Sequence, residues 1–143
     1  MNQIDLQKAG LDSRGFHTLP VRVYYEETDA AGIVYYANYL KFLERARSEA
    51  IYSMGLTNKK LLNDHGTIII VKSCKIDYKK PAKFEDLLEI ISKIKTISKS
   101  SFTMDQMIKR KEEIISESEI VLVTVNAEGK PIRIPDVLNK FLN

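Results

Sequence analysis

The sequence predicts an α+β domain in which one long helix packs against a single antiparallel sheet. A segment near residues 39–55 carries apolar residues at helical spacing, and four segments rich in β-branched residues follow between residues 67 and 126. The connectors between those four segments are short, so they join antiparallel neighbours. With 143 residues, the chain has the length of one domain with its own core.

The first element is a strand within "HTLPVRVYYEE", residues 17–27. Val21, Val23 and Tyr25 fall on one side of an alternating pattern, which is typical of a strand with one buried face. Residues 1–16 are polar and interrupted by glycine. We therefore expect residues 1–16 to form an N-terminal arm and residues 17–143 to form a single domain.

The long helix is predicted in "YLKFLERARSEAIYSMG", which follows Asn38 and ends at Gly55. Asn38 stands where a helix cap belongs, and glycine commonly ends a helix. The expected apolar face consists of Leu40, Leu43, Ala46, Ala50, Ile51 and Met54. A second, short helix is predicted in "TNKKLLNDHG", which ends at Gly66.

Four further strands complete a predicted five-stranded sheet around the helix. They are expected at residues 67–78, 87–97, 101–110 and 114–126, with a half-helix after Pro135. The strand at 87–97 has isoleucines on both faces, namely Ile91 and Ile97 on one and Ile90 and Ile94 on the other. Because the chain has no second long helix to cover the outer face, we expect a homo-oligomer.

Composition excludes several classes of protein. The net charge of +3 comes from 22 basic and 19 acidic residues, which is too balanced for a nucleic-acid-binding protein. The single cysteine, Cys74, cannot form an internal disulfide and is expected to be an inert thiol outside any metal site. The sequence contains no secretory signal and no membrane-spanning run, so we expect a cytoplasmic protein.

The segment "TDAAGIVYYANY", residues 28–39, is the most informative part of the sequence. It has one carboxylate, Asp29, ahead of a small-residue turn at Gly32, with three tyrosines at the start of the helix. A solvated loop would carry more charge, whereas a core segment would not carry an unpaired carboxylate. We therefore expect a partly buried polar site, although Asp29 could instead accept hydrogen bonds from the backbone of its own turn.

The chain resembles the YbgC-like branch of the 4-hydroxybenzoyl-CoA thioesterases, which are acyl-CoA thioesterases with the hot-dog fold. The segments that carry the resemblance are "YYEETDAAGIVYYANYLKFLERARSEA", "KIDYKKPAKFEDLLEI" and "GKPIRIPDVL". It runs from about Thr18 to the C-terminus. It implies hydrolysis of an acyl-CoA thioester to a free acid and coenzyme A, by a dimer or a dimer of dimers with active sites at the dimer interface.

The resemblance also implies roles for three residues of the motif. Asp29 corresponds to the family's general base or nucleophile, Tyr36 would donate its backbone N–H to the carbonyl oxygen, and Tyr25 would support the acyl site. Free N–H groups at a helix start suit this donor role, and Gly32 would let the turn close tightly. Many members of the branch have histidine where this chain has Tyr36, so here we expect the donor to be the backbone.

Residues that bind the coenzyme A part of the substrate are expected to be basic or polar, because coenzyme A carries phosphates. The candidates are Asn38, Lys72, Lys99, Ser100, Ser101, Lys130 and Arg133. Asn38 could equally cap the helix. Tyr35, Tyr36 and Tyr39 could contact the substrate or pack at a subunit interface, and Glu44, Arg45, Arg47 and Glu49 are expected on a solvated helix face.

Two other functions compete with hydrolysis. One is a non-catalytic module that binds acyl-CoA or acyl carrier protein in the Tol-Pal or phospholipid system. The other is a hot-dog dehydratase, which usually needs a histidine near the carboxylate, and this chain has none near Asp29. We expect a thioesterase without metal or redox cofactor, and with acyl carrier protein as a possible partner.

Overall fold

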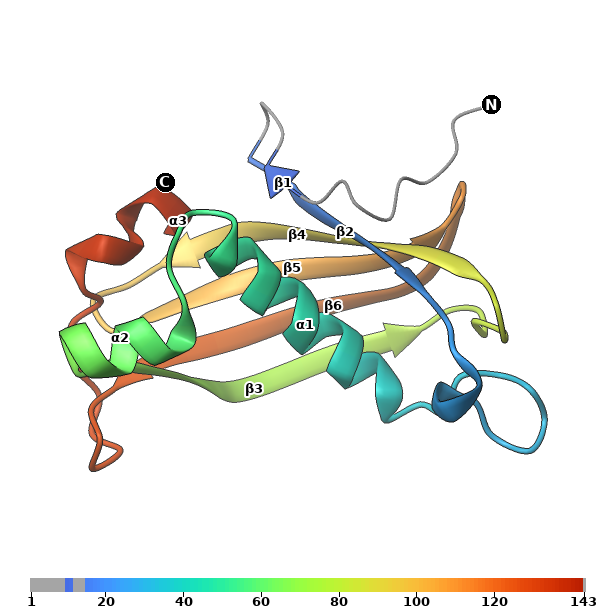
Figure 1. Cartoon of the computed structure of the whole chain (residues 1–143), viewed down its shortest axis with the longest axis horizontal. Coiled ribbons are helices and arrows are strands. Elements are labelled where there is room, and N and C mark those ends of the chain that lie inside the picture. Colours follow the sequence, from blue (N-terminus) through green and yellow to red (C-terminus); the bar gives the residue numbers. More distant parts are fainter. Residues whose placement is uncertain (1–9, 12–14, 143) are drawn as a thin grey trace.

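The computed structural model describes residues 10–11 and 15–142 and has one sheet with helix α1, Asn38–Tyr52, lying across one face (Figure 1). The strands are β1 (Gly10–Leu11), β2 (His17–Arg22), β3 (Ile68–Tyr78), β4 (Leu87–Ile97), β5 (Ser101–Arg110) and β6 (Glu113–Val125). Their order in the sheet is β1-β2-β4-β5-β6-β3, and every neighbouring pair is antiparallel. This confirms the predicted hot-dog architecture of a long helix against an antiparallel sheet.

The sheet differs from the prediction at its first strands. The two-residue strand β1 pairs with β2 and adds a sixth strand, within the segment predicted as an arm. Of the predicted arm, residues 1–9 and 12–14 lie outside the described residues. β2 ends at Arg22, earlier than predicted, and Tyr25–Glu27 forms a 3-10 turn. The Glu27 carboxylate accepts a hydrogen bond from the Tyr24 N–H at 2.6 Å, which turns the chain out of the strand.

Helix α1 buries one face against the sheet. The buried residues are Tyr39, Phe42, Leu43, Ala46, Ala50 and Ile51, whereas Leu40, predicted on the buried face, is exposed. The second helix α2, Asn58–His65, begins at Thr57, whose side chain accepts a hydrogen bond from the Lys60 N–H, and ends at Gly66 in the left-handed conformation. The tail forms the 3-10 turn η2 (Asp136–Leu138) and the short helix α3 (Asn139–Leu142).

A row of polar side chains lies beneath α1 in this apolar core. The register pairs His17 with Ser92 and Ser92 with Gln106, so the three side chains share one face of the sheet. The Gln106 amide donates to the Leu43 carbonyl at 3.0 Å and to the Ser92 hydroxyl at 2.9 Å, and its oxygen accepts from Arg47 at 2.9 Å. These bonds fix the position of α1 over β4 and β5.

His17 makes the stability of the fold depend on pH. Its side chain is buried, neither ring nitrogen has a hydrogen-bond partner among the described residues, and burial lowers its pKa below the usual value near 6.5. Below pH 6.5 the unfolded chain therefore binds a proton that the folded chain resists. The free energy of unfolding should fall by up to about 1.4 kcal/mol per pH unit until the lowered pKa is reached.

The measurement is urea unfolding of the wild type and His17→Phe at pH 7.5 and pH 5.5. The variant should lose most of the difference between the two pH values, whatever its absolute stability. His65→Gln is the control, because His65 is exposed, and it should keep the difference. An equal pH dependence in wild type and His17→Phe would contradict this account.

Candidate active site

Asp29 opens a tight turn just before α1. Its N–H donates to the Ile33 carbonyl at 2.9 Å, its carbonyl accepts from the Gly32 N–H at 3.0 Å, and one carboxylate oxygen, Oδ1, accepts from the Ala31 N–H at 2.8 Å. Gly32 has φ of 79°, which a residue with a Cβ rarely adopts. The second oxygen, Oδ2, has no hydrogen-bond partner within the described part of the chain. Asp29 thus supports its turn and still presents one oxygen for chemistry.

The start of α1 lies against this turn. The Glu27 carbonyl accepts from the Tyr35 N–H at 3.0 Å and from the Asn38 side-chain amide at 2.8 Å, which closes the segment onto itself. In the described residues the backbone N–H groups of Tyr36 and Ala37 donate no hydrogen bond. A helix start concentrates such free donors and the positive end of the helix dipole.

Asn38 does not cap the helix. It is the first residue of α1, the N-cap position is Ala37, and no side chain caps this end. The Asn38 side-chain amide donates to the Glu27 carbonyl instead. This corrects the cap interpretation and makes Asn38 a brace between the 3-10 turn and the helix.

Aromatic side chains surround the turn but are not buried. Tyr25 is 78% exposed and meets Phe84 edge to face, with ring centroids 5.8 Å apart. Tyr36 is 62% exposed, and its carbonyl accepts a hydrogen bond from the Tyr78 hydroxyl at 3.1 Å. The expectation of a partly buried site is therefore wrong for a single chain. Exposed apolar clusters are typical of surfaces that contact another molecule.

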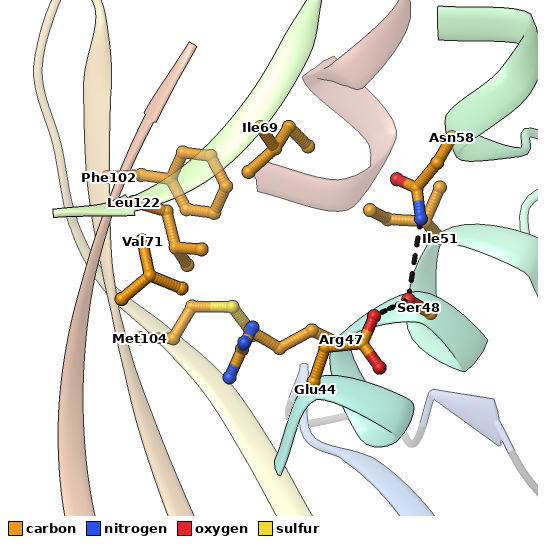
Figure 2. A pocket seen from close by; sticks show the side chains of 10 residues that line it. All are labelled: Glu44, Arg47, Ser48, Ile51, Asn58, Ile69, Val71, Phe102, Met104 and Leu122. Atoms are coloured by element: carbon orange, nitrogen blue, oxygen red, sulfur yellow. Dashed lines mark hydrogen bonds between the residues drawn. The ribbon is translucent and has the colours of Figure 1, made fainter. Parts of the chain in front are cut away.

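A pocket of about 140 Å³ opens at the other end of α1, between the helix and the sheet (Figure 2). Its lining residues are Glu44, Arg47, Ser48, Ile51, Asn58, Ile69, Val71, Phe102, Met104 and Leu122. Apolar side chains come mainly from the strands and polar ones from α1 and α2, and hydrogen bonds join Asn58 to Ser48 and Ser48 to Glu44.

Sequence reasoning missed this pocket and misplaced Arg47. Arg47 was expected on a solvated helix face, but it is half-buried, burial lowers the pKa of its guanidinium, and its Nη1 donates to the Gln106 side-chain oxygen at 2.9 Å. The register that brings β3, β5 and β6 under the C-terminal half of α1 forms the pocket. That register is not visible in the helical spacing of Glu44, Arg47 and Ser48.

The candidate coenzyme A residues divide into separate places. Lys99 and Ser100 lie in the β4–β5 turn, and Ser101 is the first residue of β5. The Lys99 carbonyl accepts from the Ile134 N–H at 2.9 Å, which brings the exposed Arg133 nearby. This turn leads directly into Phe102 of the pocket. Lys130 is exposed in the hairpin after β6, and Lys72 is exposed at a bulge in β3.

The structure therefore does not bring all the predicted site residues together in one chain. Asp29, Tyr36 and Asn38 lie at the start of α1, whereas the pocket lies beside Ser48 and Ile51. At 1.5 Å per residue, Ser48 is about 15 Å along the helix from Asn38. The carboxylate and the pocket of one chain lie at opposite ends of α1.

Strand β3 runs between these two ends along an open edge of the sheet. Its C-terminal residue Tyr78 contacts Tyr36 beside the Asp29 turn, and its N-terminal residues Ile69 and Val71 line the pocket. β3 is the last strand in the sheet, and most of its residues are exposed, including Val71 at 48%. An unpaired strand of this length offers a row of backbone groups to another chain.

No group of three or more His, Cys, Asp and Glu side chains in the described part of the chain could hold a metal ion. None of the helices in the described residues is long and apolar enough to cross a membrane.

Known proteins resemble the chain over most of its length. Residues 23–142 match the model of the thioesterase-like superfamily. The acyl-CoA thioesterase YbgC of Haemophilus influenzae is 35% identical over 82% of this chain and 88% of its own length, and that of Helicobacter pylori strain 26695 is 36% identical over 85% and 96%. A solved structure from Bartonella henselae, described as a probable thioesterase, is 34% identical with a TM-score of 0.80, and covers 84% of this chain and 99% of its own.

The brace made by Asn38 can be tested by unfolding. Asn38→Ala removes the hydrogen bond to the part-buried Glu27 carbonyl and should lower the free energy of unfolding by about 1 kcal/mol. Asn58→Ala is a matched control, because Asn58 is also the first residue of its helix but makes only an exposed 3.4 Å contact. The control should stay within about 0.5 kcal/mol of the wild type in urea titrations. Equal losses in both variants would rule out the brace.

Proposed function

Because the chain belongs to the thioesterase-like superfamily, in its YbgC-like branch, we propose that it hydrolyses acyl-CoA thioesters to a free carboxylic acid and coenzyme A. The observation that carries this function is the position of Asp29 just before the start of α1. Among the described residues, Asp29 Oδ2 has no hydrogen-bond partner, and the backbone N–H groups of Tyr36 and Ala37 have no acceptor. Thioester hydrolysis needs both at one carbonyl.

The proposed mechanism uses each group at a stated atom. Asp29 Oδ2 takes a proton from water, whose oxygen adds to the thioester carbonyl, or it attacks that carbon itself as the nucleophile. The carbonyl oxygen becomes negative and accepts a hydrogen bond from the Tyr36 N–H, at the positive end of the α1 dipole. With Asp29 as base, the C–S bond then breaks to give the free acid, and the coenzyme A thiolate takes the proton that Oδ2 removed from water. With Asp29 as nucleophile, the C–S bond breaks to leave a mixed anhydride on Asp29 and the coenzyme A thiolate, and water then hydrolyses the anhydride to the free acid and the Asp29 carboxylate. No cofactor is needed beyond the coenzyme A of the substrate.

The active unit in this proposal is a homodimer paired along β3. The exposed edge of β3 supports antiparallel pairing with the same strand of a second copy, about a two-fold axis near its middle residue, Ser73. Tyr78 at one end of β3 contacts Tyr36 beside the Asp29 turn, and residues at the other end of β3 line the pocket. The axis would therefore bring the Asp29 of one copy to the pocket of the other.

Pairing across the axis would also bring four of the candidate coenzyme A residues to the site. Lys99, Ser100, Ser101 and Arg133 lie at the pocket end, so they would face the Asp29 of the second copy, as a ligand with a long phosphate-bearing tail requires. The exposed Tyr25 and Tyr36 would be covered. The pocket volume of about 140 Å³ resembles that of an engineered cavity that holds benzene, so a short or single-ring acyl group fits.

Three finer expectations stay predictions. They are the assembly of two dimers into a tetramer, acyl carrier protein as a partner, and a cytoplasmic location. The supporting role of Tyr25 is likewise a prediction, based on its place beside the Asp29 turn.

Turnover should depend on Asp29. Release of free thiol is measured from a panel of short, aromatic and long-chain acyl-CoA substrates with the wild type and Asp29→Asn. We expect the wild type to favour short or single-ring acyl groups and the variant to lose at least about a hundredfold in kcat, since its amide is no base. The circular dichroism spectrum should not change. Normal turnover by the variant would contradict the catalytic role of Asp29.

The shared active site has its own test. Asp29→Asn removes the carboxylate and Ser48→Trp fills the pocket, so each homodimer should be nearly inactive. A mixed dimer, made by co-expression with two different tags, contains one site with both parts intact. Its activity should recover to about half of the wild-type value, because one of two sites is whole. If the activity of the purified mixed dimer does not recover, each site lies within one chain.

A further inference from the structure

Loop 79–86 lies behind the Asp29 turn and holds it in place. The Val34 N–H donates to the Ala82 carbonyl at 2.8 Å, and the Phe84 N–H donates to the Gly32 carbonyl at 3.2 Å. Ile33 and Lys83 form an isolated antiparallel bridge at the same place. Residues 32–34 therefore pair with loop 79–86 almost as a strand pairs with its neighbour.

The same loop also contacts the first turn of α1. The Ala82 N–H donates to the hydroxyl oxygen of Tyr39 at 3.0 Å, and both residues are buried. Ala82 thus bonds to the Asp29 turn through its carbonyl and to the helix through its N–H. Its position sets where the carboxylate of Asp29 stands relative to the free N–H groups of the helix start.

Loop 79–86 lies outside the helices and strands, and the backbone conformation of one of its residues is unfavourable. Glu85 has φ of 70°, a left-handed conformation that costs a residue with a Cβ about 1 kcal/mol or more. Backbone bonds between Val23 and residues Glu85 and Asp86 hold one end of the loop to β2. At the other end the Lys79 and Lys80 N–H groups donate to the Ile115 carbonyl at 2.8 and 3.2 Å, and Pro81, which follows them, has no N–H to donate.

Arg110, the last residue of β5, spans both ends of this loop. Its Nη1 donates to the Pro81 carbonyl at 3.1 Å and to Asp86 Oδ2 at 2.7 Å. The same carboxylate oxygen accepts from the Lys83 N–H at 2.8 Å. The Arg110 and Asp86 side chains are only 20% and 21% exposed, which sets this pair apart from the other described ion pairs of the chain. A guanidinium can hold two acceptors in fixed directions, which an ammonium group does less well.

We propose that Arg110, acting through Asp86 and the Pro81 carbonyl, is a positioning residue for the Asp29 turn. It touches neither substrate nor reacting atoms. It keeps loop 79–86 in the one conformation that holds the carboxylate of Asp29 at the right distance from the Tyr36 N–H. Small displacements of such a pair reduce the rate of the chemical step more than substrate binding. The inference rests on the proposed thioesterase function.

The test compares Arg110→Met, Arg110→Lys and Asp86→Asn with the wild type on the best acyl-CoA substrate. Arg110→Met should lower kcat at least tenfold and change KM less than threefold, because the turn is displaced while the pocket is intact. Arg110→Lys and Asp86→Asn should each lose less of kcat than Arg110→Met, since each keeps one polar partner. Lys95→Met is the matched control: it breaks an exposed 2.7 Å ion pair with Glu119, far from the loop, and should leave kcat unchanged.

Hydrogen exchange measured by mass spectrometry supplies a readout that does not depend on turnover. Arg110→Met should speed exchange in peptides covering residues 29–39 and 79–86, where the Val34 and Phe84 amides lie, and not in the centre of β5 or β6. A kcat within twofold of the wild type, or faster exchange throughout the sheet, would overturn the positioning role. If the wild type cleaves no substrate, the proposed function fails. The exchange data then decide separately whether Arg110 holds the loop: faster exchange confined to residues 29–39 and 79–86 would support this role, and unchanged exchange would contradict it.

Discussion

The burial of one face of α1 against the sheet is the constraint on which the rest of the structure depends. Phe42, Leu43 and Ala46 are fully buried, and the Gln106 side chain bonds to the Leu43 carbonyl, so the helix can neither rotate nor slide. A rigid helix of fifteen residues holds its two ends about 20 Å apart. The Asp29 turn is attached to one end and the pocket lies at the other, so in the proposed homodimer the helix of the second copy runs the opposite way and completes the site.

The Asp29 turn itself has little support of its own. Its residues are mostly exposed, and its single buried member, Val34, bonds to Ala82 of loop 79–86. The same loop is hydrogen-bonded to Tyr39 of the helix and to Arg110 of the sheet. Three elements that are distant in sequence thus meet at this one loop, which makes it the mechanical link between the core and the candidate chemistry.

The second link is the open edge of β3. Ile70 and Val71 are 43% and 48% exposed near the pocket end of the strand, and Tyr78 at its other end is 45% exposed. In a soluble monomer this combination of a free strand edge and apolar surface favours aggregation. Symmetric pairing along the edge would cover it and would complete the site in the same step, so oligomerisation and catalysis share one surface in our proposal.

The amino-acid sequence was sufficient for the elements and for the motif. Alternation and helical spacing are local patterns, and they predicted the bounds of α1, α2 and the four long strands to within three residues. The early end of β2 was missed, because the Glu27 carboxylate captures the Tyr24 N–H and overrides the alternating pattern through Tyr25. Asp29, Gly32 and Tyr36 were recognisable from their spacing together with the family resemblance.

Only the tertiary structure decided which of these residues meet. Asn38 braces a carbonyl eleven positions away, Tyr78 bonds to Tyr36 across 42 positions, and Arg110 reaches Pro81 across 29. Such contacts depend on strand order and register, which no local period encodes. The same holds for the pocket, whose walls come from two helices and three strands, and for the distance that separates it from Asp29. The sequence by itself determined the elements and the reactive groups, because these follow from neighbouring residues, and the packing of α1 on the sheet decided their geometry.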